Sequence, residues 1–323
     1  MKLSPFIINQ YPLKKELRIG DATITQRKSI TMSGVADDGT PFSAEFAPLP
    51  GLHKAGINLI KEELQKYLAK FHSLDQHVSL SQESNMLLEL AQLDWLKKRS
   101  PFHFFKKFKI VSGQKELLVP INKLAFTSDD IQQYIAVKRL KVKIGRSSME
   151  QEISWILALI KINPAILLRL DGNRQLTREQ LQTFHQQLPP ENIEYWEEPL
   201  SDPQQMYSLD REMPLALDET LEIFMREKNF PPGVTTWVIK PSLIGGIEKA
   251  IKFIHLAQYL GFNVIISSTF DPPSYLYYCG LLSNLLARDK EISMGLDTLK
   301  FFANPAPNPW VCERGQALKI NLF

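Results

Sequence analysis

The sequence has only two cysteines, Cys279 and Cys312, among its 323 residues. Two thiols this far apart cannot form a disulfide framework or a zinc cluster, and they favour a reducing compartment. Long hydrophobic runs are also missing, because the longest, from Trp155 to Ile160, falls far short of the ~20 residues that a membrane span needs. No apolar core indicative of a secretory signal follows Lys2. We therefore expect a cytoplasmic protein with no membrane partner.

An excess of charge of one sign is absent as well. The 38 Lys and Arg residues against 35 Asp and Glu leave a net charge of +3, which is too small to indicate a nucleic-acid partner. Hydrophobic residues make up 44% and charged residues 23%, which excludes a disordered chain. No glycine-rich phosphate loop follows the first strand of the later region, so a dinucleotide-binding fold is disfavoured.

Residues 1–115 mix strand-like and helical patterns. The turn Asp37-Asp38-Gly39 separates two runs typical of strands, and two longer stretches carry apolar residues near helical spacing. We predict strands at 22–32 and 41–46 and helices at 55–71 and 82–98.

Two other segments belong with this region. Phe104, Phe105 and Phe108, interleaved with lysines, predict a strand packed between this region and the rest of the chain. A linker rich in proline (Pro305, Pro307, Pro309) leads to residues 311–322, which we expect to return as strands to the N-terminal part.

From about Val119 onward, short apolar runs alternate steadily with amphipathic stretches. Such alternation predicts parallel strands joined by helices, and eight strands favour a closed α/β barrel over an open sheet. Helices are expected at 149–162 and 246–260, and Thr177 with Gln180 forms a capping-box pattern. The expected strands are 121–126, 140–144, 165–170, 193–196, 215–217, 236–239, 263–266 and 292–294.

Acidic residues follow three successive predicted strands, and lysines flank them. Asp171, Glu197 and Asp218 are separated by 26 and 21 residues, about one strand–helix unit each, and Lys240 follows 22 residues later. In a barrel these strand ends meet at one face, so the three carboxylates should converge. Lys141 and Lys143 alternate along one strand and should point the same way, into the barrel mouth.

Three converging carboxylates repel one another and need a counter-cation. Oxygen ligands without Cys or His favour Mg²⁺, for which Mn²⁺ could substitute. The flanking lysines would then adjoin whatever the metal holds. This arrangement indicates proton abstraction next to a substrate carboxylate, where a divalent cation stabilises the enediolate. A lysine base must be neutral to act, and nearby positive charge lowers its pKa.

These motifs, in this order, resemble the enolase superfamily and its muconate-lactonising subgroup. The details are most similar to the o-succinylbenzoate synthase family, through Pro48-Leu49-Pro50-Gly51, Ser267-Ser268-Thr269 and Gly295-Leu296-Asp297. The resemblance covers nearly the whole chain. It implies an α/β fold, a modified (β/α)7β barrel at residues 116–301, with an α+β capping domain formed by 1–115 and completed by 302–323.

The resemblance implies a lyase that dehydrates 2-succinyl-6-hydroxy-2,4-cyclohexadiene-1-carboxylate, a small dicarboxylate, to o-succinylbenzoate in menaquinone biosynthesis. Lys143 would be the base and, as its conjugate acid, would assist loss of hydroxide. Lys240 would stabilise the enediolate from the opposite face of the ring. Asp171, Glu197 and Asp218 would bind Mg²⁺.

The resemblance also implies supporting residues. Lys141 would depress the pKa of Lys143, Asn173 would lie behind the metal ligands, and Arg169 would pair with Asp171 or order Lys141. The hydroxyls of Ser267 and Ser268 and the backbone N–H of Gly295 would face the succinyl carboxylate. Glu198 is expected to alternate away from the metal, and the role of Glu219 is open, as is the oligomeric state.

The chain departs from the family pattern in two places near the distal end of the substrate. Ser43-Ala44-Glu45 stands where relatives carry Trp-Gly-Glu, and Thr269-Phe270-Asp271 replaces a Glu-Ser type segment. The loop at 20–27 is expected, from position alone, to cover the pocket.

Alternative activities on the same scaffold are N-acylamino acid racemisation, dipeptide epimerisation and muconate cycloisomerisation. All begin with the same proton abstraction, and opposed lysines suit racemisation well. Dipeptide epimerases usually carry Asp-x-Asp at the end of the eighth strand, where this chain has Asp297-Thr298-Leu299. A non-catalytic binding barrel is a further alternative, against which the costly charge cluster argues.

Overall fold

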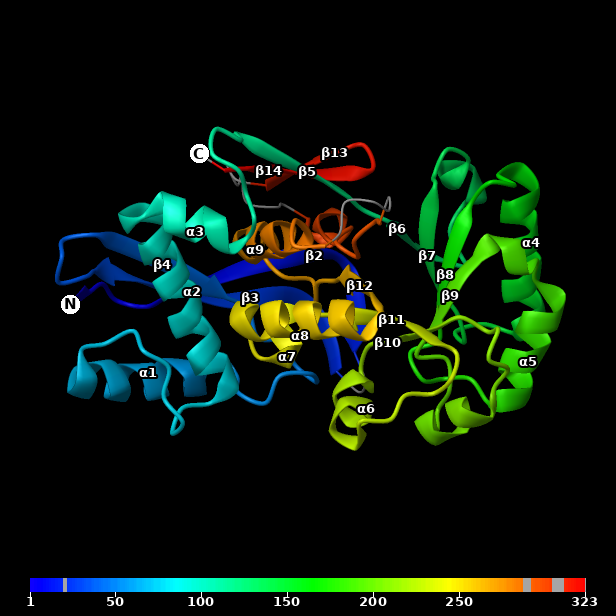
Figure 1. Cartoon of the computed structure of the whole chain (residues 1–323), viewed down its shortest axis with the longest axis horizontal. Helices are drawn as coiled ribbons and strands as arrows, with labels where there is room; N and C mark the ends of the chain where they lie inside the picture. The colour runs from blue at the N-terminus through cyan, green and yellow to red at the C-terminus, as the bar shows by residue number, and fades with distance from the viewer. Residues whose placement is uncertain (20–21, 287–291, 304–310, 323) are drawn as a thin grey trace.

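A computed structural model describes residues 1–19, 22–286, 292–303 and 311–322. Its N-terminal part is built on an antiparallel sheet in which β3 pairs with β1, β2 and β4 (Figure 1). The strands predicted at 22–32 and 41–46 are confirmed, and a long strand before them was not predicted. The bounds are β1 (Lys2–Leu3), β2 (Ile7–Ile19), β3 (Ala22–Val35) and β4 (Pro41–Phe46).

Three helices accompany this sheet: α1 (Ile57–Phe71), α2 (Gln82–Arg99) and α3 (Pro101–Lys107). The first two confirm the predicted helices, and the Ser81 side chain caps α2 by accepting a hydrogen bond from the Ser84 N–H. The strand predicted around Phe104 is wrong. Pro101 stands at the start of α3, where its missing N–H costs nothing, and the helix buries Phe104 and Phe105.

The second part is a parallel sheet of seven strands in chain order, from β6 to β12. Helices α4 and α5 lie on the outer side of β7, β8 and β9 (Figure 1). The strands are β6 (Lys123–Phe126), β7 (Arg139–Lys143), β8 (Leu167–Asp171), β9 (Ile193–Glu197), β10 (Leu215–Leu217), β11 (Val234–Ile239) and β12 (Asn263–Ile266).

The strand predicted at 292–294 is reduced to isolated bridges, yet it still joins the two edges of the sheet. Met294 pairs with Ile121, and Gly295 pairs with Ser267 at the end of β12. The Met294 N–H donates to the Pro120 carbonyl at 2.7 Å, and the Gly295 N–H donates to the Ile266 carbonyl at 2.9 Å. The expected α/β barrel architecture is therefore present, with a short irregular segment in its eighth position.

Helices connect most of the strands, as the alternating pattern predicts. The helices expected at 149–162 and 246–260 are present, and Thr177 and Gln180 form the predicted capping box on α5. The elements are η1 (Ile131–Tyr134), α4 (Met149–Ile162), α5 (Arg178–Gln187), η2 (Pro190–Asn192), η3 (Pro203–Ser208), α6 (Leu221–Glu227), α7 (Pro241–Ile244), α8 (Ile247–Leu260), α9 (Pro273–Ser283) and η4 (Leu299–Phe301).

The C-terminal segment returns as the hairpin β13 (Val311–Arg314) and β14 (Ala317–Asn321). Strand β14 pairs antiparallel with β5 (Glu116–Pro120), which directly precedes the barrel, so this hairpin forms a separate three-stranded sheet. The prolines expected to form a linker lie outside the described residues. One hydrophobic core runs from the first part into the barrel, and the domain boundary at residue 115 stays a prediction.

A buried carboxylate joins the N-terminal part to the barrel. Glu89 of α2 accepts hydrogen bonds from the Ile247 and Glu248 N–H groups at the start of α8, both at 2.8 Å. A carboxylate at a helix N-terminus satisfies free N–H groups and the positive end of the helix dipole. Gly246 has a φ of 111°, and a Cβ at this position would collide with the Glu89 carboxylate. A glycine is therefore required for this contact.

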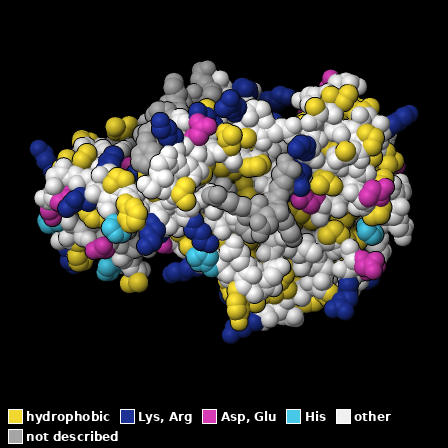
Figure 2. All heavy atoms as spheres, turned by 45° about the horizontal axis from the view of Figure 1, so that its top comes forward, with side chains coloured by type: hydrophobic (Ala, Val, Ile, Leu, Met, Phe, Trp, Pro, Cys, Tyr) yellow, Lys and Arg dark blue, Asp and Glu magenta, His cyan; other side chains and the backbone are white. Residues whose placement is uncertain are grey.

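None of the described helices is both long and apolar enough to cross a membrane. Figure 2 shows Lys and Arg side chains dispersed over the visible face, with acidic and apolar side chains between them.

Gly246→Ala should destabilise the protein more than Gly261→Ala at the other end of α8. Gly261 also has a positive φ, 81°, but a Cβ there meets nothing within 4 Å, so its substitution carries only backbone strain of about 1 kcal/mol. Gly246→Ala should cost about 2–4 kcal/mol more, because Glu89 must withdraw from two N–H groups. Denaturant unfolding would measure both, and equal costs would contradict the role of Glu89.

Candidate active site

The predicted acids and lysines lie at the carboxyl ends of neighbouring strands. Asp171 and Glu197 are the last residues of β8 and β9, and they are partners in register. Lys143, the last residue of β7, is in turn the register partner of Asp171. Because register partners in a parallel sheet point to the same face, these three side chains share the barrel mouth.

A buried ion-pair network joins β7, β8 and β9. The Lys141 ammonium lies 2.7 Å from Asp171 Oδ2 and 2.6 Å from Glu197 Oε1. The Lys143 ammonium lies 2.6 Å from Asp171 Oδ2 and donates to Asn173 Oδ1 at 2.7 Å. Since the interior screens charge weakly, each of these carboxylates is stabilised by its ammonium partner.

A second ion pair follows on the next two strands. Asp218 comes directly after β10 and Lys240 directly after β11, and the Lys240 ammonium contacts Asp218 Oδ2. Both side chains are largely buried, with exposed fractions of 13% for Lys240 and 4% for Asp218. The acids on β8, β9 and β10 thus have Lys143 on one side and Lys240 on the other.

The expectation that the three acids surround one common centre is not met in this arrangement. Among the described residues, no group of three His, Cys, Asp or Glu side chains is placed to hold a single metal ion. The physical reason is that Lys141 lies between Asp171 and Glu197 while Lys240 holds Asp218. One oxygen, Glu197 Oε2, is nevertheless buried without a hydrogen-bond partner, and a buried carboxylate oxygen in this condition is available to a cation.

The pKa values of the network's lysines are shifted in opposite directions. Burial, with the neighbouring Lys141 and Lys240 ammonium groups, lowers the pKa of Lys143 below its usual value. Burial also opposes the charge on Lys141, but Asp171 and Glu197 outweigh it and raise the pKa of Lys141. Lys143 is therefore the lysine of this pair that loses its proton more easily.

Glu198 positions Asp218, a role that the sequence analysis did not predict. Glu198 Oε1 accepts hydrogen bonds from the Asp218 N–H at 2.7 Å, the Thr220 N–H at 2.8 Å and the Thr220 hydroxyl at 2.7 Å. Its backbone has a φ of 39°, and the hydrogen bonds of its Oε1 go to Asp218 and Thr220. The adjacent pair of acids before Pro199 was the available signal.

Arg169 does not have the predicted partners. Its guanidinium pairs with Glu194 at 2.7 Å and donates to Asn122 Oδ1 at 2.9 Å and to the Ser293 carbonyl at 2.6 Å. The expected pairing with Asp171 is wrong because Lys141 and Lys143 already occupy that carboxylate. Arg169 instead ties the first, third and eighth positions of the barrel together below the acids.

All three of the expected substrate-facing groups form hydrogen bonds inside the protein. The Gly295 N–H closes the barrel on Ile266, so the expectation that it binds a substrate carboxylate is wrong. A Cβ on Gly295 would lie 2.7 Å from Ser267 Oγ, and glycine therefore serves close packing here. The Ser267 hydroxyl donates to the Gly295 carbonyl at 3.2 Å, and the Ser268 hydroxyl lies 2.8 Å from Thr298 Oγ1.

The N-terminal sheet reaches the loops of the barrel mouth. Leu17 of β2 and Ile24 of β3 form an apolar cluster with Leu49, Phe270 and Phe301. The covering loop expected at 20–27 is wrong for residues 22–27, which belong to β3, and residues 20 and 21 lie outside the described residues. The buried Arg27 guanidinium donates to the Phe270 carbonyl at 3.0 Å and the Pro48 carbonyl at 2.8 Å. This contact fixes the loop after β12, where Phe270 has a φ of 56°.

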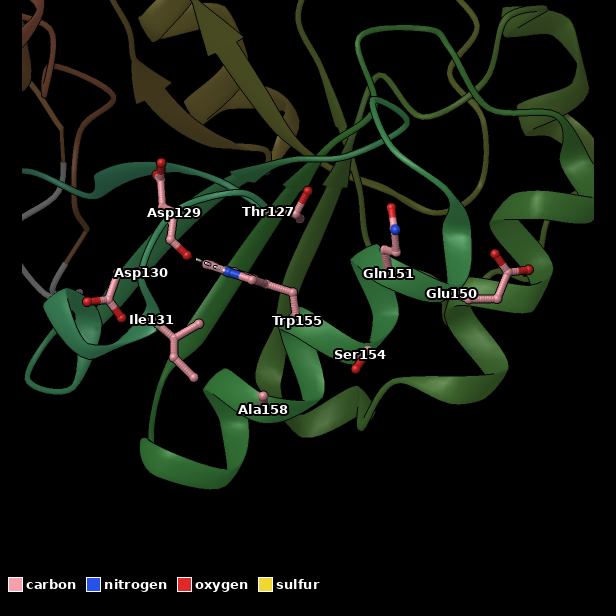
Figure 3. A pocket seen from close by; sticks show the side chains of 9 residues that line it. All are labelled: Thr127, Asp129, Asp130, Ile131, Glu150, Gln151, Ser154, Trp155 and Ala158. Atoms are coloured by element: carbon pink, nitrogen blue, oxygen red, sulfur yellow. Dashed lines mark hydrogen bonds between the residues drawn. The ribbon is translucent and has the colours of Figure 1, made fainter.

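A surface hollow of about 610 Å³ lies elsewhere, between η1 and α4. Figure 3 shows Trp155 beside Asp129, whose carbonyl accepts the indole N–H at 2.8 Å, with Glu150 at the opposite side. None of the lysines or acids of the ion-pair network lines this hollow, which is therefore separate from the predicted site.

Comparison with known proteins places this geometry in a family. Residues 127–288 match the family described as enolase C-terminal domain-like, about half of the chain. The chain belongs to this family. All of the acids and lysines of the ion-pair network lie within the matched residues.

Curated relatives also align with nearly the whole length of the chain. The o-succinylbenzoate synthase of Vibrio cholerae is 26% identical over 317 residues, which cover 93% of this chain and 90% of the relative. The o-succinylbenzoate synthase of Aliivibrio fischeri is 24% identical, and the alignment covers 96% of this chain and 94% of the relative.

Solved structures show the same fold at lower identity. The L-Ala-D/L-Glu epimerase of Bacillus subtilis superposes with a TM-score of 0.74 at 16% identity, covering 100% of this chain and 98% of its own. The o-succinylbenzoate synthase of Thermosynechococcus elongatus, solved as a complex with Mg, superposes with a TM-score of 0.67 at 19% identity. The match covers 94% of this chain and 95% of that one. The fold is thus shared by synthases and epimerases.

Removing Glu198 should weaken divalent-cation binding without removing a predicted ligand. Glu198→Ala releases the Asp218 backbone, and loss of such a supporting contact typically costs 10–100-fold in metal affinity. Thr220→Val removes one of three hydrogen bonds to Glu198 and should cost less. Calorimetric titration with Mg²⁺ or Mn²⁺ measures both.

Thr183→Val is the matched control, because the Thr183 hydroxyl donates only to the Glu179 carbonyl on α5. Circular dichroism establishes that each variant is folded. Unchanged affinity in a folded Glu198→Ala protein would show that Asp218 does not need this support.

Proposed function

We propose that this chain is an o-succinylbenzoate synthase, which dehydrates 2-succinyl-6-hydroxy-2,4-cyclohexadiene-1-carboxylate with the help of Mg²⁺. The observation that carries the proposal is the placement of Lys143 on β7 and Lys240 after β11, on either side of the acids on β8, β9 and β10. Relatives of that activity that align over more than nine-tenths of this chain support it.

The residues at these strand ends fit a divalent cation in their chemistry. Asp171, Glu197 and Asp218 supply carboxylate oxygens, the ligands that Mg²⁺ prefers, and Glu197 Oε2 is buried without a partner. To hold one ion together, the acids must turn from Lys141 and Lys240. The bound cation would neutralise the negative charge that develops on the substrate carboxylate.

Lys143 is the proposed base. Its lowered pKa favours the neutral amine that proton abstraction needs, and Asn173 Oδ1 orients it at 2.7 Å. The amine takes the proton from the ring carbon that bears the carboxylate. The ammonium so formed then gives this proton to the departing hydroxyl group, so that water leaves and the ring becomes aromatic.

Lys240 is proposed to remain charged throughout the reaction. Burial opposes its charge, but contact with Asp218 raises its pKa above the usual value. From the side opposite Lys143, its ammonium would stabilise the enediolate by charge and by cation–π attraction to the ring. Opposed lysines also suit racemisation of N-acylamino acids, which is the second candidate activity.

The end of the eighth position argues against dipeptide epimerisation. The Asp297 side chain, 1% exposed, lies 3.1 Å from the Lys123 ammonium and 2.6 Å from the Lys300 ammonium. It also accepts the Leu124 N–H at 3.0 Å. A carboxylate with these partners is not free to bind the amino group of a dipeptide.

Purified protein with Mg²⁺ should convert the cyclohexadiene substrate to an aromatic product, followed by absorbance. Lys143→Ala and Lys240→Ala should each lower kcat by about 10²–10⁴-fold, the range for loss of a group that moves or stabilises a proton. Lys161→Ala, on the outer helix α4, is the control and should retain activity. No turnover by the wild type would defeat the proposal.

Deuterium exchange at the α-carbon of N-succinylamino acids tests the racemase candidate with the same variants. Dipeptides should show neither exchange nor epimerisation, because Asp297 is already paired. Epimerisation of L-Ala-L-Glu at a rate comparable with dehydration would show that Asp297 is misassigned.

A further inference from the structure

Phe126 lies beside the proposed base at the barrel mouth. It ends β6 and is the register partner of Lys143 at the end of β7. Register partners in a parallel sheet project to the same face, so the Phe126 ring lies on the same side of the sheet as the Lys143 amine. A substrate that reaches Lys143 therefore passes close to this ring.

Arg146 covers the Phe126 ring from the loop after β7. Its guanidinium carbon lies 5.4 Å from the ring centroid, within cation–π range. The loop itself is held in place: the buried Glu152 carboxylate accepts the Gly145 N–H at 2.7 Å and the Arg146 and Ser147 N–H groups at 2.9 Å. The backbone of Arg146 is thus fixed while its side chain is exposed.

The N–H groups of the Arg146 guanidinium are available to a hydrogen-bond acceptor. In the part of the chain that the structure describes, it forms the ring contact but no ion pair or side-chain hydrogen bond. Other basic groups at this end are engaged: Lys141, Lys143 and Lys240 with acids, Arg27 with backbone carbonyls, and Arg174 with the Ser201 carbonyl.

The substrate of the proposed reaction brings two carboxylates to the site. The ring carboxylate is used at the reacting centre, and the succinyl arm ends in the other. A carboxylate drawn into a partly buried mouth needs a charged partner or strong donors. The Ser267 and Ser268 hydroxyls are engaged within the protein. A guanidinium can bind a carboxylate through two parallel hydrogen bonds.

We propose that Arg146, steadied on Phe126, binds the distal carboxylate of the substrate and so selects a dicarboxylate. The inference rests on the proposed function for the identity of the arm. Arg146 acts in binding and not in proton transfer, so its loss should raise KM much more than it lowers kcat.

Two ligands that differ only in the distal group test this. In o-succinylbenzoate the arm ends in a carboxylate, and in 2-butanoylbenzoate it ends in a methyl group. With Mg²⁺ present, calorimetry should show that Arg146→Gln weakens binding of o-succinylbenzoate roughly tenfold or more, the size expected for one charge-assisted pair. Binding of 2-butanoylbenzoate should be unchanged. The affinity of Arg146→Lys for o-succinylbenzoate should lie between those of the wild type and Arg146→Gln.

Arg174→Gln is the matched control, because Arg174 is an exposed arginine on the loop after β8, at the same end of the barrel, and should leave both affinities unchanged. An unchanged preference for o-succinylbenzoate in Arg146→Gln overturns the inference, as does a wild type that does not distinguish the ligands.

Turnover of the cyclohexadiene substrate, measured alongside, separates the two proposals. If the wild type turns over the cyclohexadiene substrate but Arg146→Gln keeps the preference for o-succinylbenzoate, only this inference is overturned. If Arg146→Gln loses that preference but the wild type shows no turnover, only the proposed dehydratase function is overturned.

Discussion

The structure depends on how buried negative charge is balanced at the ends of β8, β9 and β10. Three successive strands deliver a carboxylate to the same face, and such groups cannot all stay ionised in a weakly screened interior without cations nearby. Lys141 meets this need most directly, since one ammonium contacts both Asp171 and Glu197. The alternation of β7 then places Lys143 two residues further along, at the mouth, with a lowered pKa. A lysine that loses its proton more easily than Lys141 is a consequence of this balance.

Groups outside the network hold its members in place through backbone contacts. Glu198 fixes the Asp218 backbone, and Asn173 joins Asp171 to Lys143. Such contacts would matter in the proposed reaction because a lysine or carboxylate displaced by an ångström loses its alignment with the reacting atoms. Glu89 performs a comparable task at a distance, since its bonds to α8 attach the N-terminal part to the barrel.

The sequence predicted well what is set by repeated local patterns. The helices at 149–162 and 246–260 and the capping box at Thr177 follow from spacing and side-chain chemistry over a few residues. The acids are separated by about one strand–helix unit each, so their spacing predicts that each follows the end of a successive strand. These features need no knowledge of distant partners.

Features decided by distant partners were predicted poorly. The partner of Arg169 is Glu194, and nothing local to Arg169 distinguishes that carboxylate from Asp171. The Gly295 N–H was assigned to a substrate because its bond to Ile266 forms only when the barrel closes. At Phe104 the alternation of aromatic and basic residues resembled a strand, but Pro101 at a helix start outweighed it.

Family membership constrains the proton abstraction of the proposed reaction more than it constrains the choice of substrate. The matched region, residues 127–288, carries the acids and both lysines, and enzymes named as synthases and as epimerases share the fold. The apolar cluster of Leu49, Phe270 and Phe301 and the paired Asp297 draw largely on segments outside that region. Since proton abstraction is common to the alternatives, substrate choice must come from groups that meet the rest of the molecule. In the proposed function, the apolar cluster beside the mouth and the Arg146 guanidinium favour a cyclohexadiene substrate with an acidic arm over a dipeptide with a free amino group.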